Sequence, residues 1–318
     1  MSKIIVTGGA GFIGSHVCEA LLSKGDNVIC IDDFNDYYSP KIKRDNIDDC
    51  LRNPNFRLYE ADIYDNGIIS EIFRKNKIDV IIHLAARAGV RGSFLNPGLY
   101  QKVNVQGTLN LLNLAVEFKI SKFIFGSSSS VYGANDKVPF SENDPVNNQI
   151  SPYAITKKEA EDLCKRYSKD HNLKVACLRF FTVYGPRGRP DMAPYKFTKL
   201  IGEGKEIEVY GDGKSKRDYT HVQDIVDGIL SALEKEFDFE IINIGDSRTI
   251  ELNYLIRLIE ENLGKKANIV IKPKQKGDVE ITYADISKAK MLLSYSPKVS
   301  IEEGIKLFVE WFKKNENR

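Results

Sequence analysis

The sequence lacks the features that mark membrane proteins, disulfide-rich secreted proteins and metal enzymes. No apolar run approaches the roughly 20 residues that span a bilayer, and a strand-like run begins at Lys3, which leaves no room for a signal peptide. The five cysteines form no CxxC pair, their number is odd, and the four histidines show no metal-ligand spacing. We therefore expect a cytoplasmic protein with no disulfide framework, no metal site and no membrane partner.

An excess of charge of one sign is also missing. Lys and Arg total 46 against 44 Asp and Glu, for a formal net charge of +2. Such a balance gives no overall positive potential that would attract nucleic acid, so an anionic ligand would have to be bound by a local cluster of residues. The 318 residues exceed the usual size of one hydrophobic core, which predicts two subdomains sharing a cleft.

Short β-branched runs alternate with longer helical patterns through the first two-thirds of the chain, which indicates βαβ units. Right-handed crossovers then place helices on both faces of a parallel sheet, so the predicted fold class is α/β, with a doubly wound parallel (Rossmann) sheet. Strands are expected near residues 3–7, 27–31, 56–60, 78–82, 121–126, 174–179 and 240–244, and helices at 12–23, 100–118 and 152–169.

Beyond residue 180 the pattern becomes irregular and rich in Gly and Pro, which indicates a second, smaller subdomain. A helical pattern at 222–237 followed by a strand pattern suggests that the chain crosses back to the first subdomain. The predicted boundary is therefore interleaved. The first subdomain covers 1–179 with a return segment at about 222–247, and the substrate-binding subdomain covers 180–221 and 248–318.

The first strand leads into Thr-Gly-Gly-Ala-Gly-Phe-Ile-Gly at residues 7–14, with glycines at positions 8, 11 and 14 that open a helix. Gly8, Gly11 and Gly14 suit a tight turn, close approach of the backbone to a pyrophosphate, and close helix packing. Asp32 follows at the end of the second strand, where it can accept hydrogen bonds from the adenosine ribose. A second acid, Asp33, would help repel a 2′-phosphate, so NAD is favoured over NADP. The alternative is a flexible turn with a helix-capping Asp.

Further cofactor contacts are expected where successive parallel strands end, because ligands bind at those ends. Asp62 can accept from the adenine amino group, and the small side chains after Leu84 let backbone lie near the cofactor. Taken singly, these residues also fit ordinary packing. The remaining cofactor-binding candidates are Phe12, Ile13, Asn35, Ile63, Ala85, Ala86 and Asn104.

Tyr153 and Lys157 stand at i, i+4 in a helical segment, so the phenol and the ammonium can point into one site. Lys157 and a positively charged nicotinamide would favour the phenolate, which makes Tyr153 a candidate for proton transfer. Upstream, the fifth strand ends in a run of serines. Ser128 and Ser130 share one face of an extended segment and could hydrogen-bond a sugar hydroxyl or relay its proton.

Together the glycine loop, Ser-Val-Tyr-Gly at 130–133 and the Tyr153/Lys157 pair resemble the extended short-chain dehydrogenase/reductase family over essentially the whole chain. Within the family the sequence is similar to the UDP-glucuronate 4-epimerases. The signatures are Phe-Asn-Asp-Tyr-Tyr at 34–38, Ala-Gly-Val-Arg at 88–91 and Thr-Val-Tyr-Gly-Pro-Arg-Gly-Arg-Pro-Asp-Met at 182–192.

The resemblance implies an enzyme with Tyr153 as base, Lys157 as its partner and nicotinamide-ribose anchor, and Ser128 or Ser130 as hydroxyl assistant. Related dehydratases and decarboxylases carry acids where this chain has Ser129 and Ser130. Without an acid to assist elimination, we expect NAD-dependent 4-epimerisation of a UDP-sugar, UDP-glucuronate to UDP-galacturonate, through a transient 4-keto sugar. The alternatives are a UDP-galactose or UDP-N-acetylgalactosamine 4-epimerase and, more remotely, a non-catalytic NAD-binding scaffold.

Substrate contacts are expected from arginines in the second subdomain. Arg189 suits the sugar carboxylate because a guanidinium fork matches carboxylate geometry, and Arg187 competes for that role. The resemblance implies that Arg217 binds the diphosphate and Asp278 the uridine ribose. Arg91 and Thr182, within the signatures, complete the substrate-binding set. The resemblance also implies a homodimer formed through two helices.

Overall fold

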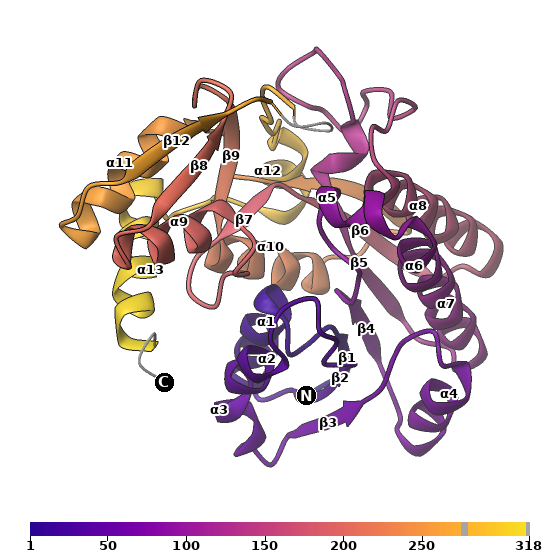
Figure 1. Ribbon diagram of the computed structural model, residues 1–318. Coiled ribbons are helices and arrows are strands. Elements are labelled where there is room, and N and C mark those ends of the chain that lie inside the picture. Colours follow the sequence, from indigo (N-terminus) through magenta and orange to yellow (C-terminus); the bar gives the residue numbers. More distant parts are fainter. Residues whose placement is uncertain (275–278, 316–318) are drawn as a thin grey trace.

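The computed structural model describes residues 1–274 and 279–315, and its centre is a seven-stranded parallel sheet in the order β10-β6-β5-β4-β1-β2-β3 (Figure 1). Because β1 pairs with both β2 and β4, Thr7 lies opposite Ile31 on one side and His83 on the other. The carboxyl ends of these strands therefore meet at one edge. The strands are β1 Lys3–Thr7, β2 Asn27–Asp32, β3 Phe56–Glu60, β4 Val80–His83, β5 Lys122–Ser128, β6 Lys174–Phe180 and β10 Phe239–Ile244.

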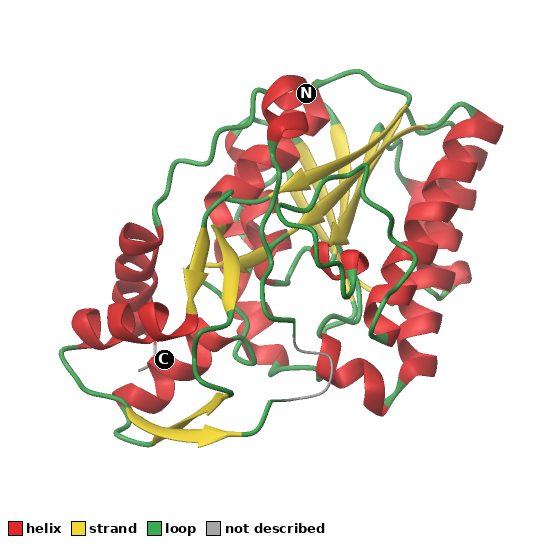
Figure 2. Cartoon of the chain, turned by 90° about the horizontal axis from the view of Figure 1, so that it is seen from above, coloured by secondary structure: helices red, strands yellow, loops and turns green. Residues whose placement is uncertain are grey.

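Helices cover both faces of this sheet (Figures 1 and 2), which confirms the predicted doubly wound α/β fold. One face carries α1 (Phe12–Ser23), α10 (Val222–Glu234) and α12 (Ser287–Leu293), and the other carries α4 (Asn66–Lys75), α7 (Gly107–Glu117) and α8 (Pro152–His171). Two apolar clusters fill the layers between helices and sheet, because the strands other than the edge strand β3 are largely buried on both sides.

The helical segment expected at 100–118 is divided into a π-helix, Gln101–Gln106, and α7. Such single π-turns are often found at functional sites. Val103 and Asn104 of this turn are buried. The smaller helices near the sheet are α2 Pro40–Asn46, α3 Asp48–Leu51, α5 Val90–Leu95, α6 Pro97–Tyr100 and a 3-10 turn, Ser129–Tyr132.

A third apolar cluster forms the core of the second region, at the upper left of Figure 1. Its two small sheets have the orders β11-β9-β7 and β12-β8. Segment 284–295, including α12, packs with the parallel sheet, so the expected range 248–318 divides between two cores. The elements of the region are β7 Thr182–Tyr184, α9 Ala193–Gly202, β8 Glu206–Tyr210, β9 Lys216–His221, β11 Thr249–Glu251, α11 Leu252–Leu263, β12 Asn268–Lys272 and α13 Ile301–Asn315.

Within the described residues, none of the helices combines the length and apolarity that crossing a bilayer requires. Nor do these residues bring together three or more His, Cys, Asp or Glu side chains in a metal-binding arrangement. All five cysteines are unpaired and buried, where a free cysteine behaves as a small apolar side chain.

Candidate active site

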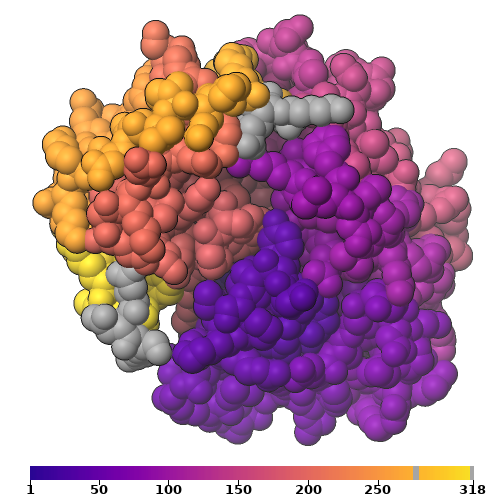
Figure 3. Space-filling model, in the orientation of Figure 1, coloured from indigo at the N-terminus to yellow at the C-terminus, as the bar shows by residue number. Residues whose placement is uncertain are grey.

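A cavity of about 610 Å³ lies where the carboxyl ends of β1, β2, β4 and β5 face the second region. Figure 3 shows a hollow between the residues near 200 and the N-terminal half of the chain. Pockets for cofactors and drug-sized ligands have volumes in this range. The cavity therefore has the size and the position at the sheet edge that a dinucleotide site requires.

Glycines form the floor of the cavity because side chains there would collide with neighbouring backbone. Gly8 has a φ of +69°, and a Cβ on it would stand 2.7 Å from the Ala85 nitrogen. A Cβ on Gly14 would stand 2.1 Å from the Gly8 oxygen. Gly11 is the N-cap of α1, and no described side chain caps this helix. The first amides of α1 are therefore available to an anion such as a pyrophosphate.

Asp32 shapes the loops on either side of the adenosine end of the cavity. Its Oδ2 accepts from the Ala10 amide at 3.1 Å and its Oδ1 from the Phe34 amide at 3.0 Å. Burial raises the pKa of this carboxyl above its usual range. A carboxylate has about four acceptor positions, so Asp32 retains capacity for ribose hydroxyls.

Asp33 and Asn35 also line the cavity, and they are joined to an arginine that the sequence reasoning passed over. The Asn35 side chain donates to Asp33 at 2.5 Å and accepts from Arg87 Nη1 at 3.1 Å. Arg87 Nη2 lies 3.9 Å from Asp33, and Arg87 Nε is buried without a hydrogen-bond partner among the described residues. Arg87 directly follows Ala86 at the end of a strand, and this position could have indicated that it lies near the cofactor site.

Most of the other predicted cofactor residues line the cavity, but Asn104 does not. Its side chain is buried, accepts from the Arg87 amide at 2.8 Å, and donates to the Arg87 carbonyl and to Thr156 Oγ1, each at 3.0 Å. The expectation for Asn104 is therefore corrected, because its amide group ties the loop after β4 to helix α8. The residues that do line the cavity are Phe12, Ile13, Asp62, Ile63, Leu84, Ala85 and Ala86.

Tyr153 and Lys157 project from α8 into the cavity, as their spacing predicts. Ser151 caps the helix by accepting from the Ala154 amide, which fixes the turn that carries Tyr153. Burial raises the pKa of Tyr153, while a hydrogen bond with Ser128 and the charge of Arg189 lower it. Lys157 Nζ donates to the Gly126 carbonyl at 2.7 Å, and burial lowers the pKa of Lys157 to about 8.

The two candidate serines lie at different distances from the reacting phenol. Ser128 lies close enough to Tyr153 to lower the pKa of the phenol, whereas Ser130 contacts Ser128, with the two hydroxyl oxygens 3.1 Å apart. The chain turns into a 3-10 helix at Ser129, because Ser128 accepts from the Ser130 amide. Ser128 is therefore the nearer of the two serines to the phenol, and Ser130 reaches it through Ser128.

The arginines of the second region are placed very differently. Arg189 lines the cavity, and its Nε and Nη2 donate to the two carboxylate oxygens of Asp191 at 3.0 and 2.6 Å. Arg189 Nη2 also contacts the Tyr37 hydroxyl at 3.5 Å. Arg187 lies outside the lining and pairs with Glu19 of α1 at 2.5 Å. The expectation that Arg187 competes for the sugar carboxylate is therefore corrected.

Arg91, Thr182 and Arg217 also line the cavity. The Arg91 guanidinium lies 5.0 Å from the centre of the Tyr210 ring. Asp278 lies outside the described residues. Sequence reasoning gave no role to Tyr37 and Tyr38, although both lie in the signature at 34–38 and line the cavity. Other polar lining residues have no motif and are brought in by tertiary contacts. They include Lys43, Lys196, Glu208 and Tyr210.

Residues 4–245 match the model of the NAD dependent epimerase/dehydratase family, which covers most of the chain. The chain belongs to this family. Membership of the NAD dependent epimerase/dehydratase family confirms the predicted extended short-chain dehydrogenase/reductase type and the predicted use of NAD. The chain therefore belongs to an enzyme family, and it carries the Tyr153/Lys157 pair that its sequence predicted as the reacting pair.

Relatives within the epimerase/dehydratase family cover nearly the whole chain. A UDP-glucuronate 4-epimerase of Thermodesulfobacterium geofontis is 44% identical over 99% of this chain and 97% of its own length. The structure of a Bacillus cereus UDP-glucuronic acid 4-epimerase with UDP-glucuronic acid and NAD has a TM-score of 0.93 at 38% identity, covering 98% of this chain and 99% of that one. A Thermotoga maritima UDP-glucose 4-epimerase with UDP-glucose has a TM-score of 0.92 at 38% identity, covering 99% of each chain.

The residues at the sheet edge fit NAD. A Cβ on Gly8 or Gly14 would collide with neighbouring backbone, so these positions leave room that a ligand can use. The first residues of α1 line the cavity, and Asp32 and Asp33 stand at the end of β2. Gly8, Gly11 and Gly14 would hold the pyrophosphate, the two acids the adenosine ribose, and Lys157 the nicotinamide ribose.

Proposed function

We propose that this chain is a UDP-glucuronate 4-epimerase, interconverting UDP-glucuronate and UDP-galacturonate through a transient 4-keto sugar. The observation that carries the proposal is that Tyr153, Lys157 and Ser128 line the same cavity as the glycine loop that suits a dinucleotide. Full-length similarity to UDP-glucuronate 4-epimerases supports the choice of substrate.

The proposed chemistry divides among a few side chains. When bound, NAD supplies reversible two-electron oxidation of the C4 alcohol. Tyr153 removes the proton from the C4 hydroxyl and returns it to the C4 oxygen after the keto sugar has rotated to present its opposite face. The Ser128 hydroxyl orients the C4 oxygen. Lys157 holds the cofactor ribose and, as a nearby cation, favours the phenolate. Arg91, Thr182, Arg217 and Asp278 are proposed to hold the UDP-sugar, and Arg189 to meet its carboxylate.

A neutral sugar is the second candidate, and the Arg189 geometry favours it. Because Asp191 engages the Arg189 fork, the pair has no net charge, which weakens its attraction for a substrate carboxylate. The UDP-glucose 4-epimerase of Thermotoga maritima is as similar to this chain as the Bacillus cereus enzyme. A UDP-galactose or UDP-N-acetylgalactosamine 4-epimerase would use the same Tyr153 and Ser128.

The deciding experiment incubates the purified protein with NAD and, separately, UDP-glucuronate, UDP-glucose and UDP-N-acetylglucosamine, and resolves the products by chromatography. We expect UDP-galacturonate from the first substrate, with a kcat/KM well above that for the neutral sugars. Preference for a neutral sugar would transfer the assignment to the second candidate. Absence of turnover on all three, with NAD bound, would support a non-catalytic scaffold.

We also propose that the protein is a cytoplasmic homodimer. Leu95 of α5 is 89% exposed and Ile155 of α8 is 43% exposed, and these helices are neighbours, so together they present apolar side chains suited to an interface. Five unpaired cysteines fit a reducing compartment. Sedimentation of the wild type and of Leu95→Asp tests the dimer, because a charge at an apolar interface should release monomers.

A further inference from the structure

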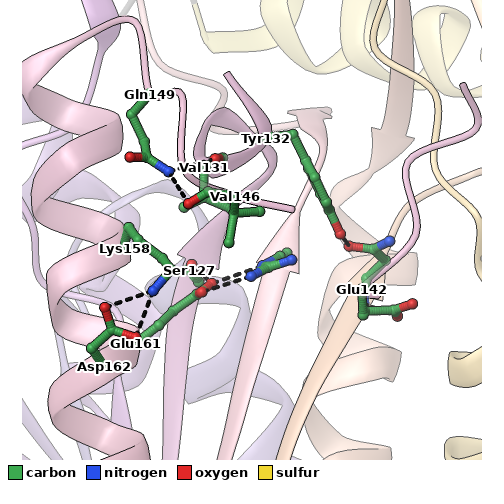
Figure 4. A network of polar contacts seen from close by, with 11 residues as sticks. Ser127, Val131, Tyr132, Glu142, Val146, Gln149, Lys158, Glu161 and Asp162 are labelled. Carbon is green, nitrogen blue, oxygen red and sulfur yellow. Dashed lines mark hydrogen bonds and ion pairs between the residues drawn. The ribbon is translucent and has the colours of Figure 1, made fainter. Parts of the chain in front are cut away.

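A fully buried ion pair lies directly beneath the catalytic residues. Arg179 of β6 donates from Nε and Nη2 to the two oxygens of Glu161 on α8, at 2.9 and 2.8 Å, and both side chains are 1% exposed. Figure 4 shows Glu161 reaching from helix α8 toward the sheet. Glu161 stands one helical turn after Lys157 and two after Tyr153, so the three side chains share one face of α8.

The same pair holds both ends of the segment 128–131, which we call the serine segment. Before it, Ser127 donates from Oγ to Glu161 Oε1 at 2.6 Å, as Figure 4 shows. After it, the Tyr132 ring lies under the Arg179 guanidinium, 4.8 Å from ring centre to Cζ, and the Tyr132 hydroxyl donates to Asn243 at 2.7 Å. The serine segment is therefore fixed at each end by one member of the ion pair.

Successive residues at the end of β5 contact one face of α8. Gly126 accepts from Lys157, Ser127 donates to Glu161, and the Ser128 hydroxyl lies near Tyr153. Three successive residues of the strand thus meet three side chains of one helix face. Glu161 itself lies outside the cavity lining, so it acts on the site through Ser127, which lies between Gly126 and Ser128.

Stability alone is a poor reason for this arrangement. Removing two charges from water costs as much as their attraction returns, and buried pairs can often be replaced by apolar residues without loss of stability. Arg179 Nη1 also lacks a hydrogen-bond partner among the described residues, so the site is not optimised for stability. A role in positioning neighbouring residues would explain why a buried ion pair is present at this site.

We propose that Glu161 and Arg179 are positioning residues for the epimerase reaction, which set the rotation of α8 against the serine segment and so place Ser128 beside Tyr153. The inference rests on the proposed function, since Tyr153 and Ser128 take their roles from it. Catalysis is sensitive to such placement, because a shift of about 1 Å in a reacting group can cost on the order of 100-fold in rate.

The test replaces the pair by the apolar double variant E161L/R179M in the full-length protein. We expect a melting temperature equal to or above that of the wild type, an NAD dissociation constant by calorimetry within about threefold, and a kcat about 100-fold lower with little change in KM. Asp162→Asn is the matched control, because it breaks an exposed ion pair with Lys158 on the same helix, also drawn in Figure 4. It should leave kcat within about twofold.

Wild-type kcat in the folded double variant would overturn the proposal. Should the double variant fail to fold, Ser127→Ala decides alone, since it cuts only the hydroxyl contact. A kcat about 10-fold lower at unchanged KM supports the proposal, and an unchanged kcat overturns it. Crystal structures of wild type and double variant separate this question from the proposed function. If the wild type does not turn over UDP-glucuronate, displacement of the serine segment from Tyr153 still supports positioning, and an unmoved segment rejects it.

Discussion

The sheet side of the cavity is built from backbone and small side chains, whereas the opposite side is built from charged side chains that hold one another. On the sheet side, Gly8 and Gly14 lie so close to neighbouring backbone that a Cβ on either would collide with it. On the opposite side, Arg189 is held by Asp191 and Tyr37. The first arrangement tolerates little change, and the second can be altered with moderate loss.

The largest effect should come from the reacting phenol on the sheet side. Tyr153→Phe removes only the hydroxyl, so NAD and substrate should still bind while kcat falls by about 10³-fold, as general acid–base catalysis typically contributes 10² to 10⁴. Steady-state kinetics with calorimetric NAD titration measures both quantities. Substantially retained turnover would exclude Tyr153 as the proton-transfer group.

The glycine floor gives the next largest effect. Gly14→Ala places a Cβ 2.1 Å from the Gly8 oxygen, so backbone must shift in the pyrophosphate loop. Overpacking of this kind costs about 1 to 3 kcal/mol, which corresponds to roughly 10- to 100-fold in NAD affinity. The matched control is Gly202→Ala in α9, where no described atom lies within 4 Å of the new Cβ. Equal NAD affinity in both variants would contradict the close packing of the floor.

Two buried groups, one in each region, should shift the pH dependence of stability in opposite directions. His83, between Thr7 and Thr108, has its pKa lowered by burial from 6.5 to about 3. The folded state keeps it neutral while the unfolded state protonates, so its contribution is present above pH 6.5 and is lost as pH falls. The slope approaches about 1.4 kcal/mol per pH unit, or roughly 2 kcal/mol between pH 6.5 and 5.

Asp218 of β9 behaves in the opposite way, because burial raises its pKa to about 6. Its contribution is present at acid pH and is lost as pH rises through 6. Urea unfolding at pH 5, 6 and 7 should therefore show a shallower acid loss for His83→Gln and a steeper one for Asp218→Asn, each relative to wild type. Parallel curves for the three proteins would contradict both assignments.

The smallest effect is expected from the charged side of the cavity. Arg189→Ala should lower kcat/KM on UDP-glucuronate by about 10-fold and on UDP-glucose by less than about threefold, because a charge-assisted hydrogen bond contributes about 1.5 to 3 kcal/mol at most and Asp191 already engages the fork. Arg187→Ala is the control, since Arg187 pairs with Glu19 outside the cavity. Equal losses on both substrates would assign carboxylate recognition to other residues.

The sheet side was largely predictable because its signals are local. The glycines, Asp32 and the Tyr153/Lys157 spacing lie within single strand-turn-helix units, where chain geometry fixes what a side chain can reach. Asn104 shows the limit of this reasoning, since both functional groups of its amide are used within the protein. Its buried position in a π-turn, and not its residue type, decides what it does.

The sequence by itself determined the fold class, the dinucleotide loop and the reacting pair, because periodicity and short motifs dictate backbone conformation over a few residues. Only the tertiary structure decided that Arg189 meets Asp191, that Arg187 turns to α1, and that Glu161 and Arg179 join under the serine segment. Long charged side chains reach partners distant in the chain, and which partner each meets depends on how the two regions pack.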